Sequence, residues 1–294
     1  MLENKIDLRS DTLTRPTAKM LFEMQNAKVG DDVFGEDPTI NELESFAAEM
    51  FGMENALFCA SGTMTNQIAI KVHTKPGDEV ICAEKAHIFV YEGGGIAFNS
   101  GCSVKLIPSE NGIFGVDDFL SRINPDDIHF PRTGLLAIEN TCNKGGGSIW
   151  ELEDMVALSK AAKANNIPFH LDGARFFNAW VEKKYPLHEI GEIFDSISIC
   201  LSKGLGAPVG SLLLGSNDFI KQARRIRKVF GGGMRQAGYL AAAGLYALQN
   251  NIDRLKVDHL RAHVIAELLK EKPFVEKLYS VETNLVIFKL QQNI

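Results

Sequence analysis

The sequence contains few cysteines, and none of them lies in a pattern that binds metal or builds a disulfide framework. The cysteines number five, an odd count, are scattered along 294 residues, and never form a CxxC pair. This spacing argues against a zinc knuckle and against a disulfide-stapled scaffold. We therefore expect reduced, mostly buried thiols and no metal site. The cysteines are Cys59, Cys82, Cys102, Cys142 and Cys200.

An excess of positive charge and long apolar runs are also absent. The formal net charge is −6, and no run of like charges occurs. Such a balance disfavours nucleic acid as a partner. No apolar run approaches the roughly 18 residues of a membrane helix, and the start MLENKIDLRSD does not resemble a secretory signal. We expect a cytoplasmic protein with no membrane partner.

Short apolar runs that alternate with stretches of helical period are the main pattern present. With 45% hydrophobic and 23% charged residues, the chain can bury a sizeable core. The alternation predicts an α/β fold with a parallel sheet flanked by helices. The candidate strands are ALFCA, EVICAE, SVKLI, GLLAIEN, PFHLDGA, SISICLS and GSLLLG.

Helix starts are expected at two possible capping boxes. One pairs Thr39 with Glu42, and the other pairs Ser148 with Glu151. A turn at SGT is predicted to open another helix, and further helices are expected from DFIKQARRIRKVF to about Lys270. The apolar face of the first helix is predicted to comprise Ile40, Leu43, Ala47, Met50 and Phe51.

A lysine at the end of an apolar strand is the most informative single feature. In SISICLSKGLGAPVGS the strand ends and presents Ser202 and Lys203 at a glycine-rich turn. Apolar surroundings disfavour the ammonium form, and a neutral amine can form an imine with an aldehyde. Lys203 is thus a candidate imine lysine, although a lysine beside glycines can also belong to a solvated loop.

An aspartate at the end of the preceding strand strengthens this interpretation. Asp172 in PFHLDGAR lies one α/β crossover before Lys203. In pyridoxal phosphate enzymes, a carboxylate keeps the pyridine nitrogen protonated so that the ring can accept electrons. His170 shares a face of the strand with Asp172. Because no further metal ligands match, we interpret His170 as a buried neighbour of Asp172.

Two glycine-containing turns remain to be interpreted. Ser61-Gly62-Thr63 can offer backbone N–H groups and hydroxyls to a phosphate at a helix start, although ordinary capping turns use the same residues. GLGAPVG resembles a dinucleotide fingerprint. Its third glycine, Gly210, is one position late, Pro208 interrupts it, and a strand follows instead of a helix. We therefore disfavour nicotinamide binding.

Several segments together resemble the motifs of low-specificity L-threonine aldolases. These enzymes use pyridoxal 5′-phosphate to cleave β-hydroxy-α-amino acids such as threonine into glycine and an aldehyde. The resemblance implies the fold type I of pyridoxal-phosphate-dependent transferases, a large domain with a mostly parallel seven-stranded sheet and a small C-terminal α/β domain. The segments are IDLRSDTLTRP, VGDDVFGEDPTINELE, SGTMTNQ, DDIHFPRTGLLAIENT, HLDGAR, ICLSKGLGAPVGSLLLG and GGGMRQAGYLAAAGLYAL.

The resemblance assigns cofactor and proton-transfer roles by position. It implies that Lys203 carries the cofactor as an imine and that Asp172 contacts the ring nitrogen. It also implies that His87 stacks on the ring and that His129 lies near the substrate hydroxyl, where that histidine or a water is the base. The implied cofactor contacts are Gly62, Thr63, His87, Asp172, Arg175, Ser202, Lys203 and Arg235.

The resemblance also implies substrate contacts and an oligomer. Ser10 and Arg175 match positions that bind the substrate carboxylate, and Phe34 matches another substrate contact. Lys228 and Arg235 match residues that reach the neighbouring subunit's site. We therefore expect a homodimer or homotetramer with active sites at the subunit interface.

The expected domain division has a large cofactor-binding domain at 1–250, including an N-terminal arm at 1–30, and a small domain beginning at 251–294. Family members continue beyond NLVIFKL, whereas this sequence ends at Ile294, so we expect the small domain to be incomplete. An aminotransferase or a β-eliminating lyase remains an alternative because such enzymes share the lysine, aspartate and phosphate turn. A cofactor-binding protein with little activity is another.

Overall fold

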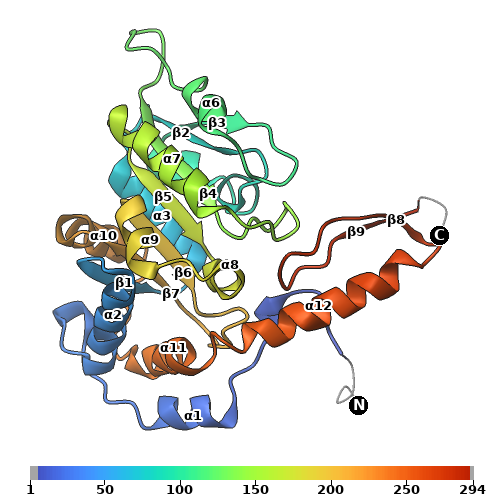
Figure 1. Ribbon diagram of the computed structural model, residues 1–294. Helices are drawn as coiled ribbons and strands as arrows, with labels where there is room; N and C mark the ends of the chain where they lie inside the picture. Colours follow the sequence, from blue (N-terminus) through green and yellow to red (C-terminus); the bar gives the residue numbers. More distant parts are fainter. Residues whose placement is uncertain (1–5, 292–294) are drawn as a thin grey trace.

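A seven-stranded sheet forms the centre of the molecule (Figure 1), whose computed structural model describes residues 6–291. The strands are β1 (Asn55–Cys59), β2 (Glu79–Ala83), β3 (Ser103–Ile107), β4 (Thr133–Glu139), β5 (Phe169–Gly173), β6 (Ser196–Cys200) and β7 (Ser211–Gly215). Their order across the sheet is β1-β7-β6-β5-β4-β2-β3. Strand β7 is antiparallel to β1 and β6, whereas the other neighbouring pairs are parallel. The predicted strands and the mostly parallel sheet are thus confirmed.

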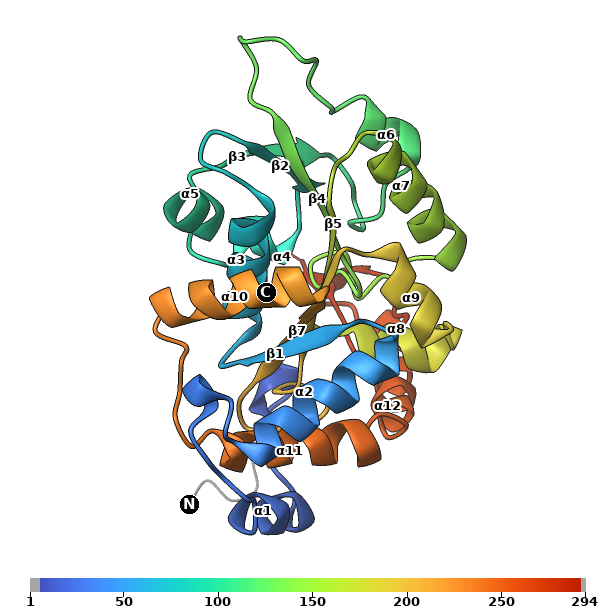
Figure 2. The ribbon, with the colours of Figure 1, turned by 90° about the vertical axis from the view of Figure 1, so that its left-hand side faces the viewer.

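Helices cover both faces of this sheet, as Figures 1 and 2 show. Helices α3, α5 and α10 pack on one face, and α2, α7, α8 and α9 pack on the other, with α11 against α2. The helices are α1 (Ala18–Gln25), α2 (Pro38–Phe51), α3 (Gly62–His73), α4 (His87–Val90), α5 (Gly95–Ser100), α6 (Val116–Leu120), α7 (Leu152–Ala164), α8 (Phe176–Lys183), α9 (Leu187–Ile193), α10 (Asn217–Val229), α11 (Gly238–Asn250) and α12 (Leu255–Lys270).

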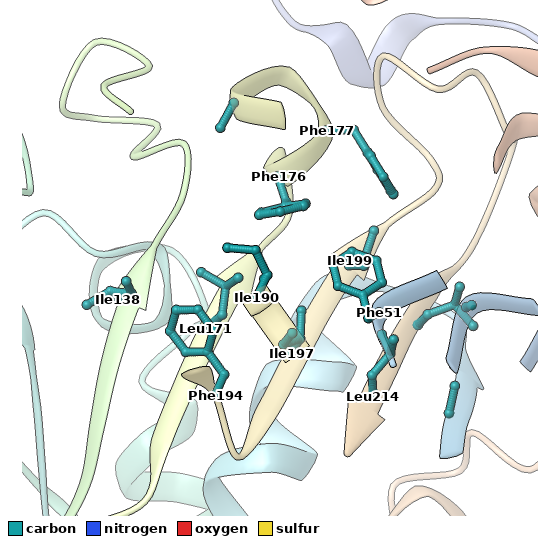
Figure 3. Packing of buried hydrophobic residues seen from close by; sticks show 14 of the residues in the cluster. Phe51, Ile138, Leu171, Phe176, Phe177, Ile190, Phe194, Ile197, Ile199 and Leu214 are labelled. Atoms are coloured by element: carbon teal, nitrogen blue, oxygen red, sulfur yellow. The ribbon is translucent and has the colours of Figure 1, made fainter. Parts of the chain in front are cut away.

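The larger part of the core lies between the sheet and the helices α2, α8 and α9. Figure 3 shows Phe51 of α2 beside Ile199 of β6, and Phe176 of α8 on the side of Leu171 of β5. The rings of Phe51 and Phe176 have centroids 5.5 Å apart. Each fully buried side chain of this size contributes about 1.5–3 kcal/mol. The central strands are apolar on both faces because helices cover both sides of them.

The two predicted capping boxes are wrong, although the helices themselves form. Helix α2 begins after Asp37, whose carboxylate accepts from the N–H groups of Thr39 and Ile40, with Pro38 in the first turn. Helix α7 begins after Glu151 without a side-chain cap. The hydroxyl of Ser148 instead donates to the carbonyl of Asn111. At α2 the carboxylate of Asp37 accepts the hydrogen bonds that Thr39 was expected to accept. Before α7 the hydroxyl of Ser148 makes a tertiary contact and does not cap the helix.

The C-terminal segment leaves the sheet through α12 and ends in a hairpin of β8 (Val275–Leu278) and β9 (Phe288–Leu290). Figure 1 shows this hairpin, in dark red, to one side of the sheet. Strand β8 was not predicted. The division near residue 250 stays a prediction, and Ile294 lies outside the described residues. Within 6–291, no helix combines the length and apolar character that crossing a bilayer requires.

All five cysteines are free and buried. This confirms the expectation of reduced thiols packed in the interior. Cys59 and Cys200 end β1 and β6, and each pairs in register with Ser211 at the start of β7. Their position marks the edge of the sheet at which the candidate catalytic residues also lie.

Candidate active site

The carboxyl ends of the parallel strands bring the predicted lysine and aspartate to one edge of the sheet. Asp172 lies near the end of β5, and Lys203 follows the end of the neighbouring parallel strand β6. The half-buried Lys203 donates from Nζ to Sγ of Cys200 at 3.2 Å. Ligand sites in α/β proteins form at this edge, where loops leave the strands. The sequence therefore predicted correctly that these two residues end adjacent strands.

The start of helix α3 approaches the same edge. A Cβ on Gly62 would lie 2.5 Å from Sγ of Cys200, so a glycine is needed for this close approach. Ser61 caps the helix by accepting from the N–H of Met64 at 3.2 Å. The remaining N–H groups of the first turn, at Gly62 and Thr63, have no partner within a helix and can bind an anion. Thr63 is exposed.

Asp172 is only 2% exposed and is held by two hydrogen bonds. Its Oδ2 accepts from Nδ2 of Asn66 at 2.9 Å, and its Oδ1 accepts from the N–H of Ala174 at 3.1 Å. Nδ2 of Asn66 also donates to Oε1 of Glu92 at 2.8 Å. The same Glu92 oxygen lies 2.9 Å from Nδ1 of His87. Asn66 thus links two buried carboxylates at the strand ends.

His87 lies beside these carboxylates. The hydrogen bond to Glu92 raises the pKa of His87 above its ordinary value, and the charge of Asp172 acts in the same direction against the effect of burial. Ligand atoms of His87, Glu92 and Asp172 all lie within 4.8 Å of one another. Concentrated negative charge of this kind suits a cationic group.

A third carboxylate, Glu139, ends the neighbouring strand β4 in register with Asp172. Its oxygens accept from the N–H groups of His87 and Asn143, both at 3.0 Å. Burial and the charge of Asp172 raise the pKa of Glu139 to about 7. Glu139 therefore fixes the backbone that carries His87.

Arg175 is buried at this edge and is paired with the N-terminal arm. Its Nε and one terminal nitrogen donate to the two carboxylate oxygens of Asp11 at 2.9 and 2.8 Å. Burial opposes ionisation of Asp11, but the hydrogen bonds and charge of Arg175 bring its pKa below the ordinary value. The arm also contacts the lysine loop, since the hydroxyl of Thr14 donates to the carbonyl of Lys203 at 2.7 Å.

Ser10 and Ser202 lie near these groups. Ser10 precedes Asp11, and its hydroxyl oxygen accepts from the N–H and hydroxyl of Thr12 at 3.2 and 2.8 Å. Ser202 is half-buried next to Lys203. The edge of the sheet thus brings together the predicted residues Ser10, Gly62, Thr63, His87, Asp172, Arg175, Ser202 and Lys203.

His129 lies elsewhere in this chain. It precedes the amino end of β4, and its side chain is 79% exposed and bonded to Asp127 at 2.7 Å. Figure 1 shows this loop projecting at the top, at the opposite end of β4 from Glu139. His129 therefore does not reach Lys203 within the same chain.

Phe34, Lys228 and Arg235 form an exposed group of their own. Arg235 donates to Asp31 at 2.9 Å and lies 5.9 Å from the ring of Phe34. Phe34 is 73% exposed, and Lys228 is exposed at the end of α10. A cavity of about 460 Å³ with His73 and Asp195 in its lining lies at the amino-terminal edge of the sheet, away from Lys203.

Several residues at the site were not found from the sequence. Asn66 and Glu92 lie inside a helix and a loop, and only the tertiary fold brings them to Asp172. Glu139 offered a usable signal, because it ends an apolar strand in GLLAIEN as Asp172 does in PFHLDGA. Asp11 gave no signal, since its importance depends on the contact with Arg175.

These residues fit pyridoxal phosphate. Gly62 lets the start of α3 approach Cys200, which Lys203 also contacts, and the N–H groups of a helix start suit a phosphate. The buried carboxylate of Asp172 accepts only neutral donors among the hydrogen bonds of residues 6–291. A protonated pyridine nitrogen would supply the missing positive charge.

Comparisons with known proteins identify the family of this chain. A family model described as "Beta-eliminating lyase" matches residues 7–293. The low-specificity L-threonine aldolase of Escherichia coli K12 is 48% identical over 90% of this chain and 79% of its own. Low-specificity L-threonine aldolase 1 of Arabidopsis thaliana is 42% identical over 99% of this chain and 83% of its own.

Similar solved structures show the same fold. The threonine aldolase of Leishmania major superimposes with a TM-score of 0.84 at 23% identity, over 96% of this chain and 83% of that one. Sheet order and flanking helices match the fold type I of pyridoxal-phosphate-dependent transferases. The chain belongs to the beta-eliminating lyase family.

Proposed function

We propose that this protein is a low-specificity threonine aldolase that uses pyridoxal phosphate to cleave L-threonine and L-allo-threonine into glycine and acetaldehyde. The observation that carries the proposal is the placement of Lys203 and Asp172 at the ends of adjacent parallel strands, beside the start of α3. The names of the relatives at 42–48% identity support the choice of reaction.

Residues at the strand ends would hold the cofactor. Pyridoxal phosphate, when bound, draws electrons from the substrate α-carbon into its ring as the bond to the β-carbon breaks. Lys203 would attach to it through the amine, and Asp172 would keep a proton on the ring nitrogen. Gly62 and Thr63 would donate N–H groups to the phosphate, with Ser202 close by. His87, held by Glu92, would lie against the ring.

Arg175 would bind the substrate carboxylate with help from Ser10. A planar guanidinium suits a carboxylate because two parallel hydrogen bonds form. In the structure the same face of Arg175 is bonded to Asp11. A substrate carboxylate would therefore compete with Asp11 and loosen the arm when it binds.

Residues remote from Lys203 in this chain would act in a neighbouring copy. Arg235, Lys228 and Phe34 are exposed together, and His129 is exposed on a projecting loop. We propose a homodimer or homotetramer in the cytoplasm, in which Arg235 and Lys228 complete the partner's site. His129, or a water bound to it, would take the proton of the substrate β-hydroxyl.

The direct test is to incubate the purified protein with pyridoxal phosphate and threonine and to measure acetaldehyde. Lys203→Ala should reduce the rate on the order of a thousandfold or more, whereas Lys221→Ala, at an exposed lysine of α10, should not change it. Release of keto acid or ammonia in place of acetaldehyde would instead identify an aminotransferase or a β-eliminating lyase. Binding of the cofactor without turnover would identify a protein of little activity.

A further inference from the structure

A line of polar side chains, buried except for the half-buried His73 at its far end, runs from Asp172 along the sheet, away from the site. Asn66, which donates to Asp172, accepts at Oδ1 from Nε2 of His170 at 3.1 Å. Nδ1 of His170 lies 2.8 Å from the hydroxyl of Ser196. Nε2 of His73 lies 2.8 Å from the same hydroxyl. The mechanism proposed above uses none of these four side chains.

The protons along this line can be placed by counting donors. Ser196 has one hydroxyl proton and faces two histidine nitrogens, so it donates to one ring and accepts from the other. Asn66 faces two carboxylates, Asp172 and Glu92, which can only accept when ionised. Its NH₂ group must point toward them, because its carbonyl oxygen would repel both. Its Oδ1 is then left for His170.

The orientation of Asn66 fixes the proton positions on His170, Ser196 and His73. His170 must carry its proton on Nε2 to donate to Asn66, so its Nδ1 accepts from Ser196. Ser196 in turn accepts from Nε2–H of His73. Burial lowers the pKa of His170 to about 3 and that of His73 to about 4, so each ring is neutral near pH 7 and carries one proton. Every donor therefore points toward Asp172.

We propose that His170 and Ser196 are positioning residues that hold the NH₂ group of Asn66 toward Asp172, and thereby keep this carboxylate aligned for the pyridine nitrogen of the cofactor. This inference rests on the proposed function. Without Ser196, His170 can move its proton to the other ring nitrogen, and Asn66 loses the donor that fixes its amide.

The test compares cofactor affinity in matched variants. Ser196→Ala removes the hydroxyl between the histidines, and His170→Phe removes both hydrogen bonds of the ring. Each should weaken binding of pyridoxal phosphate about tenfold. The double variant should bind no more weakly than His170→Phe alone, because both act through Asn66. Ser198→Ala is the control, because this buried hydroxyl lies two residues along the same strand but bonds Thr65.

A second measurement does not depend on the cofactor. Nitrogen NMR of histidine-labelled protein without pyridoxal phosphate should find the proton of His170 on Nε2 in the wild type, and a mixture of the two ring forms in Ser196→Ala. The inference is overturned if the proton lies on Nδ1, if Ser196→Ala binds the cofactor as Ser198→Ala does, or if the two losses of affinity add. A wild type that binds no pyridoxal phosphate would instead remove the proposed function, and the NMR result would still stand.

Discussion

At the scale of single residues, the site is organised by buried charge. Asp172, Glu92 and Glu139 lie close together, and burial of several carboxylates is unfavourable unless each is hydrogen-bonded or paired. Asp172 and Glu92 share the amide of Asn66, and Glu139 is bonded to two backbone N–H groups. The raised pKa of Glu139, about 7, reflects its burial and the nearby Asp172. A cationic cofactor nitrogen would relieve this repulsion.

The Asp11–Arg175 pair gives a prediction about stability and pH. Asp11→Asn should lower the free energy of unfolding by about 2–4 kcal/mol near neutral pH, because it leaves a buried guanidinium without its counterion. The pKa of Asp11 is lower in the folded protein than its ordinary 3.8. Asp11 therefore stabilises the fold fully at pH values above its ordinary pKa of 3.8. This stabilisation is lost as the pH falls through the lower pKa that Asp11 has in the folded protein.

Urea unfolding of the wild type and Asp11→Asn across a pH series measures this difference. The difference should stay constant from about pH 5 to 8 and shrink below about pH 4. Asp7→Asn is a matched control, since Asp7 pairs with Arg9 on the same arm but in an exposed position. A difference that grows on acidification, or an equal effect of both substitutions, would contradict the assigned role of the pair.

At the scale of secondary-structure elements, the site depends on how closely α3 approaches the end of β6. Gly62→Ala places a Cβ 2.5 Å from Sγ of Cys200, so the helix start or the strand end must move. We expect a loss of about 1–3 kcal/mol in stability and weaker binding of pyridoxal phosphate. Thermal unfolding and a cofactor titration measure the two effects.

Gly115→Ala is the control for this substitution. Gly115 also precedes a helix, but a Cβ there would meet only Asp118 Oδ2, at 3.6 Å. It should cost at most about 1 kcal/mol, as a poorer N-cap residue does, and should leave cofactor binding unchanged. If Gly62→Ala behaves like Gly115→Ala in both measurements, the close approach of α3 is not what builds the phosphate site.

The strands could be predicted from the sequence more fully than the helix ends. Each central strand is an apolar run bounded by polar or glycine residues, and helices on both faces make that pattern unambiguous. Cap positions depend on which of several nearby polar side chains accepts hydrogen bonds from the N–H groups of the first turn. At α2 Asp37 does so ahead of Thr39, and before α7 Ser148 bonds Asn111 instead.

The candidate site was predictable only in part. Lys203 and Asp172 could be found because both follow apolar strands whose ends must meet at one edge of a parallel sheet. Asn66, Glu92 and Asp11 could not, because their roles arise from contacts between segments far apart in the sequence. The position of His129 at the opposite edge could have been predicted, because DDIHF precedes the strand GLLAIEN and therefore lies at its amino end.

At the scale of the whole molecule, the proposed oligomer can be tested by subunit complementation. Lys203→Ala and Arg235→Ala should each be inactive alone if Arg235 completes the partner's site. Mixed dimers would contain one site with both residues intact, so dissociating and reassociating equal amounts should restore up to about a quarter of the wild-type activity. The assay is threonine cleavage before and after mixing.

The matched control mixes Lys203→Ala with Asp172→Asn. Both residues belong to one chain's site, so a mixed dimer has one site that lacks Lys203 and one site that lacks Asp172, and no activity should return. Activity that returned in this mixture would contradict the assignment of Lys203 and Asp172 to one chain's site. If the mixture with Arg235→Ala also stays inactive although mixed dimers form, Arg235 serves the site of its own chain.

The most direct measurement for the whole account is to identify the lysine that binds the cofactor. Protein incubated with pyridoxal phosphate is reduced with borohydride, digested, and its peptides are sequenced by mass spectrometry. The account predicts that the cofactor is fixed on Lys203, in the peptide that follows β6. Label on a different lysine, or no label at saturating cofactor, would contradict it.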